Sequence, residues 1–207
     1  MKNTMKTLIA TLALILIGST FVAKASSING QTILNDIKKV NTIHVAGNVS
    51  LILVQSFDES VKVYNEYYAN NAFVQQKDND LRISSFDKAP LTVVVYVSNL
   101  TEISASDNAT VKTYGNFNLL SLVVNLKDSA TANLKTNTID LYSNLSGKAS
   151  LTLSGSTTSY GSVMDSFSTV NMEQFAAESS NIKSKTSPIA AKINKKELYI
   201  MAQSLSK

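Results

Sequence analysis

Two carboxylates, Asp107 and Asp128, occupy equivalent positions in consecutive copies of a repeated sequence motif. If the copies stack, the carboxylates lie close enough to share a Ca²⁺ ion or to act as acid and base on a polysaccharide. The next equivalent positions are Gly147 and Ser166, which carry no charge. The column of acids therefore ends after two members, and we expect the aspartates to form turns.

A tyrosine cluster is the second candidate for chemistry. Tyr64, Tyr67 and Tyr68 lie in a polar segment that also contains asparagines. Aromatic rings beside amides can stack on a sugar and hydrogen-bond it. Alternatively, the rings pack over the margin of the fold. Together with Asp107 and Asp128, these tyrosines form the candidate surface site.

The chain has a single histidine, His44, and no cysteine. A zinc site needs three or four converging ligands, so we interpret His44 as a solvated strand residue. No catalytic residue, metal or cofactor is expected.

The elements that must position these residues form a repeat between residues 100 and 192. Its period of about 20 residues is typical of a β-solenoid, in which successive coils pair in parallel. Four copies are the clearest, and they are almost evenly spaced: 107–113, 128–134, 147–153 and 166–172.

Alternation within the copies predicts which side chains point inward, because residues two apart share a face. Ala109, Ala130, Ala149 and Ser168 form one predicted inward column, while Thr131 points to solvent. Asparagine pairs one period apart are expected to stack at the corners of the coils. These pairs are Asn125 with Asn144, and Asn116 with Asn137.

Residues 1–25 resemble an export signal. Lys2 and Lys6 precede an apolar run, and Ala23-Lys24-Ala25 has the pattern of a signal-peptidase site. We expect cleavage before Ser26 and, without cysteine, no lipid anchor. The predicted organisation is a cleaved signal at 1–25, an N-terminal cap at 26–42 with a short helix at 28–40, and a β domain at 43–207. The protein is expected in the periplasm, at the cell surface or secreted, with no membrane span after cleavage.

Charge argues against a nucleic-acid binder. Without the signal, sixteen basic residues face fifteen acidic ones, a net charge of +1, and nucleic acid requires a concentrated basic face. Residues 183–207 hold six lysines and one glutamate. These lysines either meet an anionic partner or protect the last strand from pairing with another chain.

Strand spacing also carries a family resemblance. The segment from Ile43 to Gln55, followed by Val61-Lys62-Val63, Leu81-Arg82-Ile83 and the strand into Leu100-Thr101-Glu102-Ile103, resembles the putative auto-transporter adhesin, head GIN domain family. The resemblance implies an envelope protein of Gram-negative bacteria with a right-handed parallel β-helix.

The combined prediction is an all-β, single-domain right-handed parallel β-helix (β-solenoid) with coils of about 20 residues. Its predicted function is a non-catalytic, adhesion-like binding module of the cell envelope that contacts a glycan or another envelope protein. The alternative is a polysaccharide-active enzyme, a lyase or glycoside hydrolase, on the same scaffold. The oligomeric state stays open.

Overall fold

The described residues of this chain, 26–28, 31–64 and 72–185 of a computed structural model, contain only strands as regular elements. The strands are β1 (Ser26–Ile28), β2 (Gln31–Leu34), β3 (Thr42–Gly47), β4 (Val49–Gln55), β5 (Ser60–Tyr64), β6 (Ala72–Lys77), β7 (Asp80–Ser85), β8 (Leu91–Val97), β9 (Glu102–Ala105), β10 (Thr110–Tyr114), β11 (Phe117–Leu126), β12 (Thr131–Leu145), β13 (Ser150–Asp165) and β14 (Thr169–Lys185).

Strict alternation of apolar residues explains why these segments form a sheet with one buried face. In β8, Leu91, Val93, Val95 and Val97 are fully buried while the residues between them are half-buried. The same pattern recurs in β3, β4 and β7. Because side chains two apart share a face, each strand contributes one apolar stripe to a common core.

The predicted right-handed parallel β-helix is wrong. The described strands form one curled, mixed sheet in the order β1-β2-β5-β8-β4-β10-β12-β11-β9-β3-β7-β6, to which β13 and β14 add beyond β12. β5 runs antiparallel to β2 and to β8, and β6 runs antiparallel to β7. Residues before β9 lack the repeat that would require every coil to run in one direction, and a tight turn at Asp78, with φ of 56°, reverses the chain into a hairpin.

The predicted register of the repeated segment is confirmed. Thr110 pairs with Thr131, Thr131 with Ser150, and Ser150 with Thr169, all in parallel. The inward column is also confirmed, because the side chains aligned with it are at most 5% exposed: Ala109, Ala130, Ala149 and Ser168.

One predicted asparagine pair is confirmed and the other is wrong. Asn125 pairs with Asn144. Asn137 pairs with Asn118 rather than with Asn116, and its Nδ2 donates to Asn118 Oδ1 at 3.0 Å. The sequence offset between paired residues is larger from β10 to β12 than from β11 to β12, because the turn after Tyr114 has no counterpart within β12.

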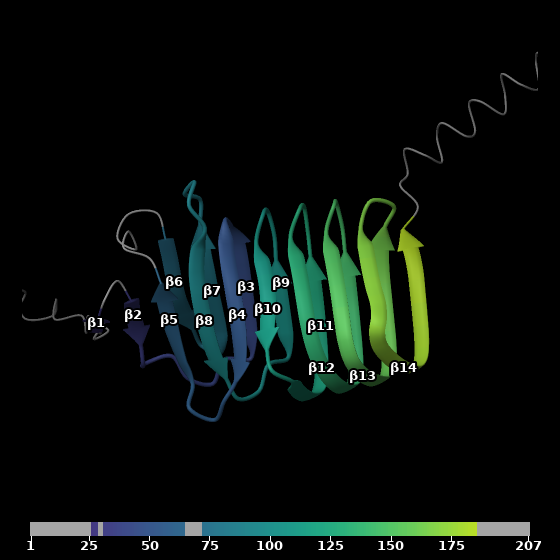
Figure 1. Cartoon of the computed structure of the whole chain (residues 1–207), viewed down its shortest axis with the longest axis horizontal. Coiled ribbons are helices and arrows are strands. Elements are labelled where there is room, and N and C mark those ends of the chain that lie inside the picture. The colour runs from purple at the N-terminus through teal and green to yellow at the C-terminus, as the bar shows by residue number, and fades with distance from the viewer. Residues whose placement is uncertain (1–25, 29–30, 65–71, 186–207) are drawn as a thin grey trace, which may run out of the picture.

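The sheet curls back on itself, so that two walls face each other across the core (Figure 1). β12 shows how the walls join, because its first residues pair with β10 and its later residues pair with β11. β13 and β14 run alongside it with the same curl. We call the side formed by β4, β8 and β10 the first wall and the side formed by β7, β3, β9 and β11 the second wall.

The segment before β3 differs from the helical cap that the sequence predicts. Residues 31–34 form β2, and no helix lies between residues 31 and 42. The carboxylate of Glu59 ties this segment to the first wall, since it accepts hydrogen bonds from the N–H groups of Val40 and Ser98. Burial raises the pKa of Glu59, but the bonds from Ser98, Val40 and Lys39 together hold that pKa below its usual value.

No helix in the part of the chain that the structure describes has the length and apolar character of a membrane span.

Candidate binding groove

A row of polar side chains crosses the outer face of the second wall. Strand pairing aligns Arg82 with His44, and His44 with Ser104. The row continues through Asn125 to Asn144. In each of the five strands, the residues directly before and after the polar residue point into the core, so the polar side chain points outward. The five polar side chains therefore lie on the same line.

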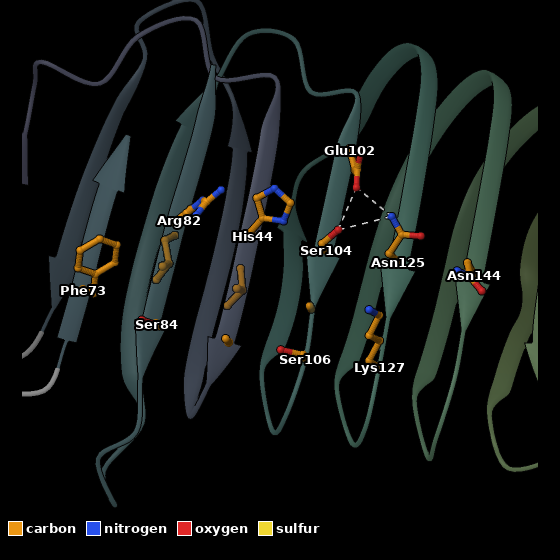
Figure 2. Close-up of a pocket in the computed structure, with 14 residues that line it drawn as sticks. His44, Phe73, Arg82, Ser84, Glu102, Ser104, Ser106, Asn125, Lys127 and Asn144 are labelled. Atoms are coloured by element: carbon orange, nitrogen blue, oxygen red, sulfur yellow. Dashed lines mark hydrogen bonds between the residues drawn. The ribbon is translucent and has the colours of Figure 1, made fainter. Parts of the chain in front are cut away.

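This row lines an open groove of about 680 Å³. Figure 2 shows its side chains side by side, from Phe73 on β6 through Arg82 and His44 to Asn144 on β12. The groove therefore crosses six neighbouring strands, which corresponds to about 24 Å at the usual spacing between strands. Its floor is hydrogen-bonded sheet, so its side chains start from fixed backbone positions.

A carboxylate network occupies the middle of the groove. Glu102 Oε1 accepts a hydrogen bond from the Ser104 hydroxyl at 3.0 Å and another from Asn125 Nδ2 at 2.9 Å. Figure 2 marks both bonds. Both donors to this oxygen are neutral groups.

Cations and an aromatic ring flank the network. Arg82 and Lys127 are exposed and His44 is half-buried. Phe73 is 47% exposed on the neighbouring edge strand, where it pairs with Ser84. The groove thus offers a guanidinium, an ammonium, amides and one apolar ring to a ligand.

The structure places Asp107 and Asp128 in tight turns outside the groove lining. Both have a φ of 59°, a left-handed conformation that aspartate tolerates. Asp107 Oδ2 accepts from the N–H of Gly47 at 2.9 Å, and Asp128 Oδ2 lies 3.4 Å from the N–H of Asp107. Each carboxylate thereby bonds the turn of a neighbouring layer.

Sequence reasoning missed a third acid of this type, Asp165. Its Oδ2 accepts from the N–H of Gly147 at 2.6 Å, and its Oδ1 accepts from Phe167 and Ser168. The bond from Gly147 lowers the pKa of Asp165, burial raises it, and the bonds from Phe167 and Ser168 lower it further, to below its usual value. Asp165 stands immediately before the aligned position Ser166, so a search for identical spacing passes over it.

Of the three tyrosines in the candidate surface site, the structure describes Tyr64, which lies on β5. Tyr64 ends β5, is 42% exposed, and accepts a hydrogen bond from Gln31 Nε2 at 3.2 Å. Tyr67 and Tyr68 lie outside the described residues. The candidate surface site that combined these residues with the two aspartates stays a prediction, and the groove is a separate location.

His44 has a larger role in the geometry than its sequence context indicates. It is the second member of the polar row, between Arg82 and Ser104. No group of three or more His, Asp or Glu suited to a metal ion occurs among the residues that the structure describes. The signal that could have located the groove is the alternating polar position in five separate strands, and it becomes visible only when their register is known.

The fold and the groove define an all-β, single-domain protein with an open polar surface on a rigid sheet. The family model of the putative auto-transporter adhesin, head GIN domain matches residues 40–204. The chain belongs to this family, as the resemblance in its strand spacing implied. Membership in an adhesin-like family agrees with an exported or surface protein. No relative with a curated description matches the chain.

Three solved structures share the fold. A putative adhesin from Bacteroides fragilis NCTC 9343 is 16% identical with a TM-score of 0.64, covering 75% of each chain. A putative adhesin from Parabacteroides distasonis ATCC 8503 is 16% identical with a TM-score of 0.57, covering 79% of each chain. A putative lipid binding protein from the same strain is 11% identical with a TM-score of 0.57, covering 74% of this chain and 77% of the other. At these identities the likeness concerns the fold alone.

Proposed function

We propose that the chain is a non-catalytic binding module of the bacterial envelope and that the groove on the second wall is its recognition surface. The observation that carries this proposal is the open groove of about 680 Å³. Its exposed Arg82 and Phe73 stand on paired strands, and its exposed Lys127 directly follows β11. A surface that is already ordered loses little conformational freedom when it binds a partner.

The side chains of the groove favour a glycan over an apolar ligand. Hydroxyl and amide groups of Ser104, Asn125 and Asn144 can exchange hydrogen bonds with sugar hydroxyls. Phe73 supplies a single ring for packing rather than a continuous apolar lining. An envelope protein with a polar surface is the second partner of this kind, and both belong to the same class of function.

The experiment is a binding screen of the chain without residues 1–25 against a glycan array, detergent-solubilised envelope proteins and lipid vesicles. The variant Phe73→Ala removes the exposed ring of the groove. Tyr114→Ala is the matched control, because it removes a ring that is 75% exposed at the end of β10, on the first wall. Saturable binding that Phe73→Ala weakens and Tyr114→Ala leaves unchanged supports the proposal. Binding that ignores both changes, or no binding at all, contradicts it.

A polysaccharide lyase is the second candidate, because the groove holds one specific arrangement that favours it. Arg82 could neutralise a sugar carboxylate while the neighbouring His44 accepts the proton from the adjacent carbon. A C=C bond then forms as the glycosidic C–O bond breaks, and water protonates the leaving oxygen. A glycoside hydrolase fits less well, since it uses a pair of carboxylates and Glu102 is the single acid among the groove residues. An assay for unsaturated sugar product decides between the two, and turnover that His44→Gln abolishes would replace the binding proposal.

Export is part of the proposal. The charged start, apolar run and Ala23-Lys24-Ala25 pattern support cleavage before Ser26, and the lack of cysteine supports a protein without a lipid anchor. N-terminal sequencing of the protein from fractionated cells tests both points. A mature N-terminus at Ser26 in the periplasmic, outer-membrane or medium fraction is expected. A retained Met1 in the cytoplasm contradicts export.

A further inference from the structure

We infer that the groove selects an acidic polysaccharide, with Arg82 as the residue that binds a sugar carboxylate. This inference rests on the proposed function, because it names the ligand class of the same groove. Its basis is the charge arrangement along the polar row. Beside that row, Glu102 Oε1 already accepts two hydrogen bonds, while Arg82 and Lys127 are exposed.

The two residues paired with Arg82 across the sheet carry no carboxylate, and the acid on its face of β7 is Asp80, two residues earlier. Strand pairing places Gln75 on one side of it and His44 on the other. Glu102, the acid of the groove, accepts its hydrogen bonds from Ser104 and Asn125 instead. The guanidinium is exposed, and its planar set of donors matches the two oxygens of a carboxylate.

Phe73 stands at a distance from Arg82 that suits a sugar ring carrying an acid group. Phe73 pairs with Ser84, which is the next residue after Arg82 on the same face of β7. Such diagonal neighbours lie about 7 to 8 Å apart. A pyranose ring can therefore pack its apolar side on Phe73 while its carboxylate reaches Arg82.

The remainder of the groove suits a chain of sugars. Beyond His44, the amides of Asn125 and Asn144 follow at successive strands, about 4.8 Å apart. Lys127, next to the end of the strand that carries Asn125, adds a second cation. A groove of about 24 Å spans several sugar units. Two amides and two cations along one groove thus fit a polymer in which hydroxyls and carboxylates recur.

The amide-rich lining and the aromatic ring favour a polysaccharide over an acidic peptide. An acidic peptide would pair its carboxylates with the cations of the groove. Its backbone would find few hydrogen-bond partners there, because the backbone groups in the floor of the groove already pair with one another within the sheet. Sugar hydroxyls instead meet Asn125 Oδ1 and Asn144 Nδ2, since Asn125 Nδ2 already donates to Glu102 and Asn144 Oδ1 already accepts from Lys185 Nζ.

The test measures equilibrium binding of oligogalacturonate to the chain without residues 1–25, at two salt concentrations. The probes for comparison are the same oligosaccharide with its carboxyl groups reduced, and polyglutamate of similar length. Arg82→Gln should weaken oligogalacturonate binding about tenfold to a hundredfold, because it removes a charge-assisted pair. The affinity of Arg82→Lys for oligogalacturonate should lie between those of the parent protein and Arg82→Gln, because lysine keeps the charge and loses the planar geometry.

The matched control is Lys112→Gln, which removes an exposed cation from β10 on the first wall. It should leave the binding of oligogalacturonate unchanged. Circular dichroism and thermal unfolding of each variant show that the comparison concerns folded protein.

The outcomes separate this inference from the proposed function. The acidic specificity is overturned if the carboxyl-reduced oligosaccharide binds as tightly as oligogalacturonate and if this binding is lost in Phe73→Ala but not in Arg82→Gln. The groove would then still be the binding surface. Equal Arg82-dependent binding of polyglutamate overturns the choice of a polysaccharide. Equal losses in Lys112→Gln and Arg82→Gln overturn the assignment to the groove, and absence of binding to any glycan or envelope component overturns both proposals.

Discussion

The described residues before and after Leu100 build their parts of the sheet in different ways. From residue 102 to 185, neighbouring strands pair in parallel at a nearly constant sequence offset, and their polar rows repeat from layer to layer. From residue 31 to 97, hairpins and antiparallel neighbours interrupt this order. The groove lies at the junction, with β6, β7 and β3 from the irregular part and β9, β11 and β12 from the repeated part.

This difference indicates how a repeating scaffold acquires a specific surface. The repeated part contributes similar side chains at equivalent places, such as Asn125 and Asn144. The irregular part contributes the side chains that have no equivalent in the next layer, namely Phe73, Arg82 and His44. The distinctive chemistry of the groove therefore depends on the part of the chain that the repeat does not describe.

The comparison predicts that the two parts unfold together despite their different construction. Leu81 in β7 and Leu134 in β12 are both fully buried in one continuous core. Truncation of either to Ala should cost about 2 to 5 kcal/mol of unfolding free energy. Urea unfolding followed by circular dichroism should show one transition that both changes shift. Two separate transitions, each sensitive to one change, would mean that the parts are independent units.

The inward column of the repeated part gives the next largest effect. Ala130 is fully buried between Ala109 and Ala149, so Ala130→Phe should overpack the core and cost about 1 to 3 kcal/mol. Its neighbour Thr131 is exposed, and Thr131→Val serves as the control. Comparable losses of unfolding free energy from the two changes would show that the layers are not packed as described.

Substitutions in the turns of the repeated part should show whether the backbone conformation or the charge of the aspartates contributes more to the unfolding free energy. At a φ of 59°, Asp128→Asn keeps a residue that tolerates the left-handed region, whereas Asp128→Val introduces a branched side chain there. We expect a loss of about 1 to 2 kcal/mol for Val and a much smaller one for Asn. Chemical denaturation measures both, and the double change of Asp107 and Asp128 to Asn should leave glycan binding intact. Loss of binding in that double variant would restore the aspartates as a candidate site.

The smallest expected effect is a dependence on pH. The pKa of Asp165 in the repeated part and the pKa of Glu59 in the irregular part both lie below their usual values in the folded chain. Each charged group therefore stabilises the fold at neutral pH, and this stabilisation is lost as pH falls through the lowered pKa values, below about pH 4. The difference in unfolding free energy between the parent and Asp165→Asn or Glu59→Gln should shrink from pH 7 to acid. A constant difference would contradict the role of the charge.

Sequence reasoning reached the register of the repeated part because small residues recur there at fixed places. Ala109, Ala130 and Ala149 identify the layers without knowledge of the structure. The antiparallel strands β2, β5 and β6 carry no such repeat, and alternation alone does not state which strand pairs with which. The sequence therefore could not predict the mixed sheet. The parallel arrangement of the repeated part was wrongly extended to the residues before it.

The groove was unpredictable for a related reason. Arg82 and His44 lie far apart in the sequence and become neighbours only through the pairing of β7 with β3. In the sequence each is a single polar residue in an alternating strand, which is typical of any solvent-facing position. By contrast, the aspartates attracted attention because they repeat, and their repetition reflects the turns between layers.

Hydrogen–deuterium exchange with and without saturating oligogalacturonate tests the central claim most directly. The account predicts ligand-dependent protection concentrated in β6, β7, β3, β9 and β11, where the groove crosses from the irregular part to the repeated part. The first wall, including β4 and β10, should exchange as in the free protein. Protection confined to the first wall or to β14, with the groove strands unchanged, would contradict the claim that the junction of the two parts is the recognition surface.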